Sequence, residues 1–263
     1  MNIISQYLQK HQDRCALIPF ITAGYPDINT TIEALYELDS QGADIIELGI
    51  PYSDALADGS IIQQSSLVAL KQGTFIDQVL FILETVSPKL SAPIIIFTYY
   101  NPILKRGIEK FIQEISIMGA KGLIVPDLPL EETDDLIEVC NMHKIELVLF
   151  IAPTSSIARI KSISQKSPGC IYLVSATGVT GVRENVDIKV MELSNYIKKV
   201  SNKLIMLGFG ISKPEHVNKV SRWNIDGVVV GSAFVKRLSA LSLSDRINSL
   251  SDLCKSLKNA TRL

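Results

Sequence analysis

The sequence is poor in the residue types that hold metals or carry redox chemistry. Its 263 residues include four cysteines and three histidines. None of them has a partner at the spacing of a metal site or a redox pair. We therefore expect no metal site, and we expect the cysteines to be buried thiols of a reducing compartment. The residues concerned are Cys15, Cys140, Cys170, Cys254, His11, His143 and His216.

An excess of charge of one sign is also missing. The 26 lysines and arginines and the 27 aspartates and glutamates give a net charge of −1, and the basic residues are scattered along the chain. This distribution offers no electrostatic footprint for nucleic acid or for an anionic membrane surface. We therefore expect neither as a partner, and we expect any anionic ligand to be small.

Long apolar runs are missing as well. No run reaches the ~18 residues that a membrane span requires. Residues 1–10 form a short amphipathic stretch without the basic start and apolar centre of a secretion signal. We expect a chain that is not secreted. Its richness in Ile, Lys, Ser and Asn is typical of an A/T-rich genome such as an organelle's, so the expected compartment is the cytoplasm or a plastid stroma.

What the sequence does contain is a repeated alternation of strand and helix patterns. Eight short runs rich in Val, Ile and Leu are each followed by apolar residues at helical spacing. This alternation predicts a parallel sheet with crossover helices, either closed as a barrel or open and doubly wound. The count of eight, and the clustering of glycine and polar residues after the strands, favour a (β/α)8 TIM barrel. The predicted strands are 16–22, 43–50, 94–99, 122–125, 145–151, 170–174, 204–207 and 227–230.

One domain is expected over residues 1–263, because no linker or change of composition interrupts the alternation and a single barrel runs to roughly 250 residues. Extra helices are predicted before the first strand, after the second strand and at the C-terminus. Polar residues mark two helix starts. Asp27 is predicted to be an N-cap, and Ser-Lys-Pro-Glu at residues 212–215 has the form of a capping box.

A stretch with three carboxylates runs from Glu47 to Gly59. Glu47 lies in an apolar strand that should be buried on both faces, and Pro51 then ends the strand. The loop that follows carries Asp54 and Asp58 among small residues. An inward acid on a strand and a second acid on a mobile loop suit proton transfer on an enclosed substrate. The plainer alternative is that Glu47 pairs with a basic group and that the aspartates are solvated turn formers.

Glycine-bearing turns follow the last three predicted strands, at residues 175–181, 208–212 and 231–233. Glycine lets backbone N–H groups approach an anion closely, and the loops after the seventh and eighth strands of this fold commonly hold phosphate. We therefore predict a phosphate site at this rim. The alternative is that the glycines only turn the chain.

Further candidate contacts lie around the same rim. The loop at 178–185 begins with Gly-Val-Thr-Gly and could close over a ligand, with Thr180 meeting Asp58. Tyr172 could position Glu47 or a substrate hydroxyl, or it could be a half-buried barrel tyrosine. Apolar residues at the rim suggest a flat hydrophobic part of the substrate. They are Phe20, Ile62, Phe97, Ile124 and Phe209.

Five segments combine these features in a fixed order: Pro19 to Pro26, Glu47 to Gly59 with Gln63, Val125 to Pro129, Ser175 to Gly181, and Gly208 to Ile211. Together they resemble the tryptophan synthase alpha chain family over nearly the whole chain. The resemblance implies a (β/α)8 barrel that cleaves indole-3-glycerol phosphate to indole and glyceraldehyde 3-phosphate. It also implies a partner, the pyridoxal-phosphate-dependent beta chain of an alpha2-beta2 heterotetramer, which receives indole and joins it to serine. No cofactor is implied in this chain itself.

The resemblance also assigns roles to individual residues. Glu47 falls on the family's acid and base, which protonates the indole ring carbon and takes the glycerol hydroxyl proton. Asp58 falls on the second catalytic carboxylate, which stabilises positive charge at the indole nitrogen. The other matches are the active-site tyrosine, the closing-loop threonine and the phosphate-site residues, namely Tyr172, Thr180, Gly181, Phe209, Gly210, Gly231 and Ser232.

Three residues differ from the commonest form of the family's motif. Tyr52 replaces Phe, and Ala55 and Ser60 each replace Pro. We expect catalysis to survive these changes. The absence of two prolines predicts a more flexible loop, and ordering such a loop at the interface with the beta chain costs more entropy.

Two other functions remain open from the residues alone. Another phosphate-binding barrel enzyme, such as indole-glycerol-phosphate synthase, would want a buried lysine on a strand, whereas Lys121 and Lys203 lie at strand starts. A barrel that has lost catalysis and only activates a partner would have no use for an inward acid such as Glu47, which is costly to bury. An assay of indole release separates these functions.

Overall fold

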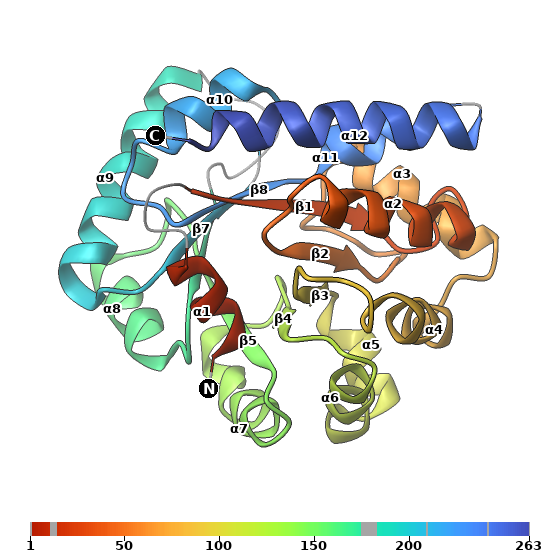
Figure 1. Cartoon of the computed structure of the whole chain (residues 1–263). Coiled ribbons are helices and arrows are strands. Elements are labelled where there is room, and N and C mark those ends of the chain that lie inside the picture. Colours follow the sequence, from red (N-terminus) through yellow and green to blue (C-terminus); the bar gives the residue numbers. More distant parts are fainter. Residues whose placement is uncertain (1, 11–14, 175–182, 209, 241, 263) are drawn as a thin grey trace.

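The eight predicted strands form a closed parallel barrel. The computed structural model describes residues 2–10, 15–174, 183–208, 210–240 and 242–262. The strands follow one another around the barrel in chain order, and the first pairs with the eighth, so the open-sheet alternative is wrong. The strands, most of which are labelled in Figure 1, are β1 (Ala16–Thr22), β2 (Ile46–Gly49), β3 (Ile94–Phe97), β4 (Gly122–Ile124), β5 (Glu146–Ile151), β6 (Ile171–Val174), β7 (Ile205–Gly208) and β8 (Gly227–Val230).

Most strands are shorter than the apolar runs that predict them. The predictions for β1 and β8 match the structure residue for residue, whereas the run at 43–50 supplies only Ile46–Gly49. A strand extends only as far as it pairs with adjacent strands, and β2 pairs with β1 and β3 only within that range. Apolar residues on either side, such as Ile45 and Ile50, are buried without belonging to the ladder.

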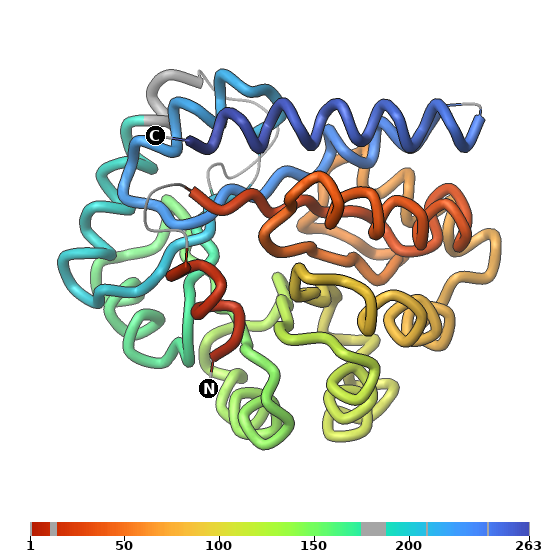
Figure 2. The backbone as a smooth tube through the Cα atoms, viewed as in Figure 1, coloured from red at the N-terminus to blue at the C-terminus, as the bar shows by residue number. Residues whose placement is uncertain are grey.

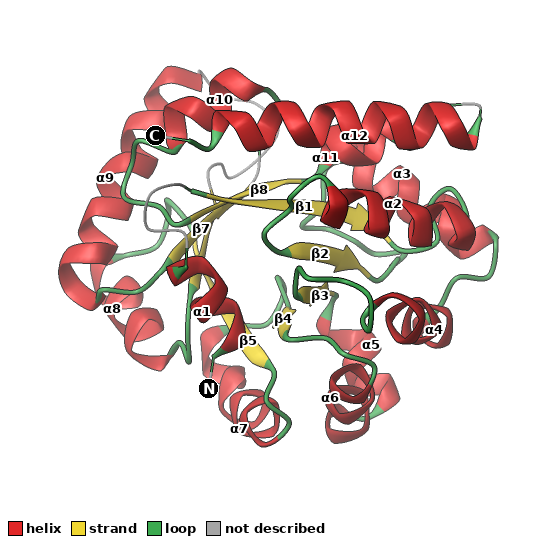
Figure 3. Cartoon of the chain, in the orientation of Figure 1, coloured by secondary structure: helices red, strands yellow, loops and turns green. Residues whose placement is uncertain are grey.

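Helices cover the outside of the barrel, as Figure 3 shows. The predicted extra helices are present before β1, between β2 and β3 and at the C-terminus, where the last helix packs against α2 and α10. The pattern does not predict α5, whose seven residues are too few for an apolar period. The helices are α1 (Ile3–Gln9), α2 (Ile28–Ser40), α3 (Ser60–Lys71), α4 (Ile76–Val86), α5 (Tyr100–Arg106), α6 (Ile108–Ile117), the 3₁₀ helix η1 (Leu130–Glu132), α7 (Thr133–Met142), α8 (Ile157–Lys166), α9 (Arg183–Ser201), α10 (Pro214–Val220), α11 (Ser232–Arg237) and α12 (Leu243–Ala260).

One of the two predicted helix starts is confirmed. The Asp27 side chain accepts the N–H of Thr30 at 2.7 Å, as an N-cap does. The predicted capping box at 212–215 is wrong, because α10 begins at Pro214 with Lys213 as an N-cap that makes no side-chain bond. The residue before a proline favours the extended region, which suits the N-cap position. Proline suits the first helical position, because the N–H that it lacks would have no acceptor within the helix. Ser212 therefore lies one residue too far from the helix.

The core consists of two apolar layers. Residues that point outward from the strands pack under the helices, and residues that point inward fill the barrel. Phe20, Phe97 and Tyr172 are among the inward ones. Gly49 and Gly208 make room for two of these rings, because an added Cβ would lie 2.6 Å from the ring of Phe20 and 2.0 Å from the hydroxyl of Tyr172, respectively.

Helix α1 closes the end of the barrel at which the strands begin (Figure 2). Ile4 and Leu8 lie against the first residues of β4 and β8. Glu146, buried at the start of β5, accepts the backbone N–H groups of Ser5 and Cys170, each at 3.0 Å. These contacts fill the N-terminal end, and the chemistry of this fold belongs to the opposite rim.

All four cysteines are buried and unpaired, as predicted. In the described ranges, no group of three or more His, Cys, Asp and Glu side chains is arranged to hold a metal ion. Among the helices built from described residues, none is by itself long and apolar enough to cross a membrane. Helices α3 and α4 meet that test only as a pair bent by 97°.

Candidate active site

Glu47 lies inside the barrel on β2, beside Phe20 of β1 and Ile95 of β3. Its side chain is 1% exposed, and Oε1 has no hydrogen-bond partner within the described part of the chain. Burial raises the pKa of this carboxyl to about 8, because the charged form loses its hydration. Glu47 is therefore mostly protonated at neutral pH. The structure pairs it with no basic group among the residues it describes.

Asp58 lies half-buried in the loop between β2 and α3. Its Oδ2 accepts a hydrogen bond from Oη of Tyr99 at 3.0 Å. Burial raises the pKa of Asp58 to about 6, and the hydrogen bond from Tyr99 acts in the opposite direction. Asp58 is thus mainly ionised at a pH at which Glu47 keeps its proton. Two carboxyls held in different protonation states suit one proton donor and one stabiliser of positive charge.

Three hydrogen bonds hold the Asp58 loop at the rim. The N–H of Ala57 donates to Oη of Tyr99 at 3.0 Å. Nε2 of Gln63 donates to the carbonyls of Ala55 and Asp58 at 3.0 and 3.1 Å. Ala55 is itself buried among the inward apolar residues. These contacts restrain the loop although no proline stands at position 55.

Tyr172 on β6 faces the same interior space. Its ring packs on Phe150 with the ring centroids 4.9 Å apart. Burial raises the pKa of its hydroxyl, and the charges of Glu47 and Asp58 raise that pKa further. Tyr172 therefore remains a neutral hydroxyl that can donate a hydrogen bond beside the two carboxyls.

Replacing Gly208 with Ala is expected to displace Tyr172. The new Cβ would lie 2.0 Å from its hydroxyl, so the ring or the strand must shift, which costs about 1–3 kcal/mol of stability. Urea unfolding measures this loss. The matched control is Gly59→Ala, whose Cβ meets nothing within 4 Å, and equal losses in the two variants would contradict the steric argument.

Apolar side chains line the barrel beside these polar groups. The ring of Phe20 meets that of Phe97 edge-on, with the centroids 5.6 Å apart. Phe20 and Ile62 both approach Gly231, within 3.5 and 3.4 Å of the position that a Cβ would take there. Ile124 is buried inside the barrel. Four of the five apolar residues predicted at the rim therefore belong to one interior wall or its edge.

The predicted phosphate turns are described in part. Gly210 has a φ of +78°, a left-handed conformation that favours glycine. Gly231 and Ser232 begin α11, where the first backbone N–H groups have no acceptor within the helix. Since Phe20 and Ile62 lie against Gly231, this turn borders the apolar wall. Outside the described residues lie the turn at 175–181, with Thr180 and Gly181, and also Phe209.

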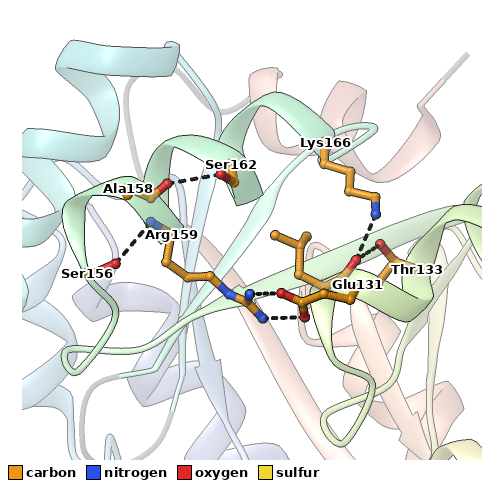
Figure 4. Close-up of polar contacts among 8 residues, drawn as sticks. Glu131, Thr133, Ser156, Ala158, Arg159, Ser162 and Lys166 are labelled. Atoms are coloured by element: carbon orange, nitrogen blue, oxygen red, sulfur yellow. Dashed lines mark hydrogen bonds and ion pairs between the residues drawn. The ribbon is translucent and has the colours of Figure 1, made fainter.

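Polar contacts among η1, α7 and α8 brace the chain after β4, as Figure 4 shows. Arg159 contacts both carboxylate oxygens of Glu131, one of them at 3.0 Å. Nζ of Lys166 and the hydroxyl of Thr133 each donate to the carbonyl of Leu130 at 2.8 Å. An exposed ion pair contributes at most about 1 kcal/mol. These contacts position the segment after β4, and none of them involves a residue of the candidate site.

Tyr99 is the residue at this rim that the sequence analysis misses. It follows β3 directly after Thr98 and is 3% exposed. Its hydroxyl contacts both Asp58 and the backbone of Ala57. The available signal was its place just beyond a strand end, since residues there face the site in this fold.

Comparison with known families gives one consistent result. The family model described as "Tryptophan synthase alpha chain" matches residues 7–262. A relative of that name from Antithamnion sp. is 79% identical over 263 residues, covering 100% of both chains. Another, from Gracilaria tenuistipitata var. liui, is 62% identical over 258 residues, covering 98% of this chain and 96% of the relative.

Solved structures agree with these relatives. A tryptophan synthase structure from Mycobacterium tuberculosis superposes with a TM-score of 0.90 at 30% identity, covering 100% of this chain and 99% of that one. The tryptophan synthase complex from Pyrococcus furiosus gives a TM-score of 0.84 at 33% identity, covering 94% of this chain and 99% of that one.

Proposed function

Because the chain belongs to the tryptophan synthase alpha chain family, it is a lyase that cleaves indole-3-glycerol phosphate, and we propose that Glu47 and Asp58 carry out this cleavage. The products are indole and glyceraldehyde 3-phosphate. The observation that supports the two residues is the buried Glu47 carboxyl, whose Oε1 has no hydrogen-bond partner among the residues that the structure describes. It shares the barrel interior with Tyr172 and has Asp58 at the adjacent rim.

The reaction is a retro-aldol cleavage of the bond between the indole C3 and the first glycerol carbon. Protonated Glu47 gives its proton to C3, and the ring nitrogen, conjugated with C3 through C2, then carries positive charge. Asp58, ionised, accepts the N–H and stabilises that charge. The Glu47 carboxylate next takes the glycerol hydroxyl proton. The breaking bond leaves its electron pair in the ring as the aldehyde forms, so Glu47 ends the cycle protonated.

The substrate's two ends fit two different parts of the rim. The indole ring is proposed to lie on the apolar wall of Phe20 and Ile62, with Tyr172 beside the glycerol chain. The phosphate is proposed to bind the turns after β6, β7 and β8, where backbone N–H groups and a helix start favour an anion. Its proposed contacts are Thr180, Gly181, Phe209, Gly210, Gly231 and Ser232.

The partner is proposed to be a tryptophan synthase beta chain in an alpha2-beta2 heterotetramer. Several solved relatives are described as tryptophan synthase structures, one of them as an a2b2 complex from Pyrococcus furiosus. In this proposal pyridoxal phosphate belongs to the beta chain, and this chain uses no cofactor. Leu56, 90% exposed at the tip of the Asp58 loop, offers an apolar contact.

The chain is further proposed to act as one domain in a plastid stroma or a cytoplasm. Named relatives come from red algae such as Antithamnion and from cyanobacteria such as Trichodesmium erythraeum. A red-algal origin favours the plastid stroma, and a cyanobacterial origin favours the cytoplasm.

Indole release from indole-3-glycerol phosphate tests the proposed function. The purified chain should release indole slowly alone and faster beside a beta chain from a relative. A chain that binds the phosphoester yet releases no indole, even with the beta chain present, would favour the subunit that only activates its partner.

The pH dependence of kcat/KM for indole release should be bell-shaped. As pH falls through about 6, Asp58 gains a proton and loses the charge that stabilises the ring cation. As pH rises through about 8, Glu47 loses the proton that it must donate. Since kcat/KM reports the ionisations of the free protein, steady-state assays across this range measure both. A rate that keeps rising well above pH 8 would contradict the assignment of Glu47 as the acid.

A further inference from the structure

The hydroxyl of Tyr99 occupies a central position in the Asp58 loop. It donates to Oδ2 of Asp58 and accepts the N–H of Ala57, both at 3.0 Å. Among the residues that the structure describes, Oδ1 of Asp58 accepts no hydrogen bond. One oxygen of the carboxylate is therefore fixed, and the other remains available as an acceptor.

Rigid elements hold Tyr99 itself in place. It lies between the end of β3 and the first residue of α5, whose Tyr100 N–H donates to Oδ1 of Asp127 at 2.9 Å. Its ring packs against Tyr52 with the centroids 5.1 Å apart and against Phe97 at 6.4 Å. Because its ring is packed, the hydroxyl of Tyr99 has a fixed position and can hold the carboxylate of Asp58, which lies on a loop.

We propose that Tyr99 is a positioning residue for Asp58, holding Oδ2 so that Oδ1 is presented to the N–H of the indole ring. This inference rests on the proposed function. It adds a residue that touches no reacting atom and acts through Asp58. The same hydroxyl accepts the N–H of Ala57, so it fixes the position of the loop backbone as well as that of the Asp58 carboxylate.

The same hydrogen bond favours the ionised form of Asp58. Burial raises the pKa of Asp58 to about 6 while the bond from Tyr99 opposes that rise. Other titratable groups near this pair are Asp127, whose charge acts on Tyr99, and Tyr172, on which the charges of Asp58 and Glu47 act. Burial and the charge of Asp58 raise the pKa of Tyr99, so it stays a neutral donor throughout the working pH range. Without its hydroxyl, the pKa of Asp58 should rise further.

Tyr99→Phe removes this hydroxyl and keeps the ring. A hydrogen bond to a charged group should be worth about one pH unit or more in the titration of that group. We expect the acid limb of the pH profile of kcat/KM, where the rate falls as Asp58 gains a proton, to move to higher pH by about that amount. We also expect kcat to fall about tenfold with a smaller change in KM. A merely structural role would lower stability without moving the limb.

Tyr52→Phe is the matched control. It removes the hydroxyl of the ring that packs on Tyr99, and that hydroxyl bonds Asn101 at 3.3 Å rather than Asp58. We expect the acid limb of this variant to stay in place. A limb that moves equally in both variants would overturn the inference, because the effect would then come from the aromatic pair.

A second measurement makes the test independent of turnover. The carboxyl carbon of Asp58, identified by its loss in Asp58→Asn, can be titrated by NMR in the wild-type chain and in both variants. The pKa of Asp58 should rise in Tyr99→Phe only. An unchanged titration overturns the role of Tyr99, whereas a wild-type chain that releases no indole overturns the proposed function.

Discussion

Glu47→Gln should lower kcat for indole release by roughly 10³–10⁴-fold while substrate affinity changes little. Glutamine has the size of glutamate but can neither protonate a ring carbon nor accept the glycerol hydroxyl proton, and general acid–base catalysis contributes up to about 10⁴-fold. The Glu47 side chain is fully inside the barrel, and the described residues leave Oε1 without a partner. Single-turnover indole release measures the rate, and calorimetry with the uncleaved substrate measures the affinity.

Glu146→Gln is the matched control for this variant. Glu146 is also a buried acid inside the barrel, but it lies at the opposite end, where it accepts the N–H groups of Ser5 and Cys170. Its replacement should lower stability, since it holds α1, and leave the rate of indole release within a few-fold. Substantial cleavage by Glu47→Gln would remove Glu47 from the mechanism.

Asp58→Asn should lower kcat by roughly 10²–10³-fold, the size of effect that follows from removing one charge-stabilising group. The asparagine oxygen can still accept from Tyr99, so the loop should keep its place. What the variant lacks is the negative charge that meets the cationic ring nitrogen. The acid limb of the pH profile near 6 should also disappear, because that limb is assigned to Asp58.

The matched control for this variant is Asp54→Asn, on the same loop. Asp54 is exposed, and its Oδ2 accepts a hydrogen bond from the hydroxyl of Ser53 at 2.9 Å. The isolated chain carrying this change should cleave at the wild-type rate. If Asp58→Asn also kept the wild-type rate, Asp58 would be a structural residue of the loop.

The barrel itself follows from the sequence because its signal is repeated eight times. Each strand is buried on both faces, which gives a continuous apolar run that is easy to recognise. The ends of strands are harder to predict, because the residues beside β2 are equally apolar and only the lengths of β1 and β3 decide where its ladder stops. The prediction of a capping box at 212–215 is wrong for a local reason, because Pro214 fixes where α10 begins.

The candidate site was predictable where a residue contradicts its surroundings. Glu47 is such a residue, because an acid in an apolar strand requires a function or a partner. The place of Tyr99 beyond a strand end indicates that it faces the rim, but its role could not be predicted, because a tyrosine there is common and its bond to Asp58 joins residues 41 positions apart. The roles of Thr180, Gly181 and Phe209 remain predictions that rest on the family resemblance.

A structure with a bound indole-alkyl phosphate tests the central claim most directly. Such a ligand lacks the glycerol hydroxyl and cannot be cleaved. The account predicts the ring nitrogen about 3 Å from an oxygen of Asp58, C3 beside the carboxyl of Glu47, and the phosphate against the turns after β7 and β8. A ligand whose ring lies away from both carboxyls, or whose phosphate binds elsewhere on the chain, would contradict it.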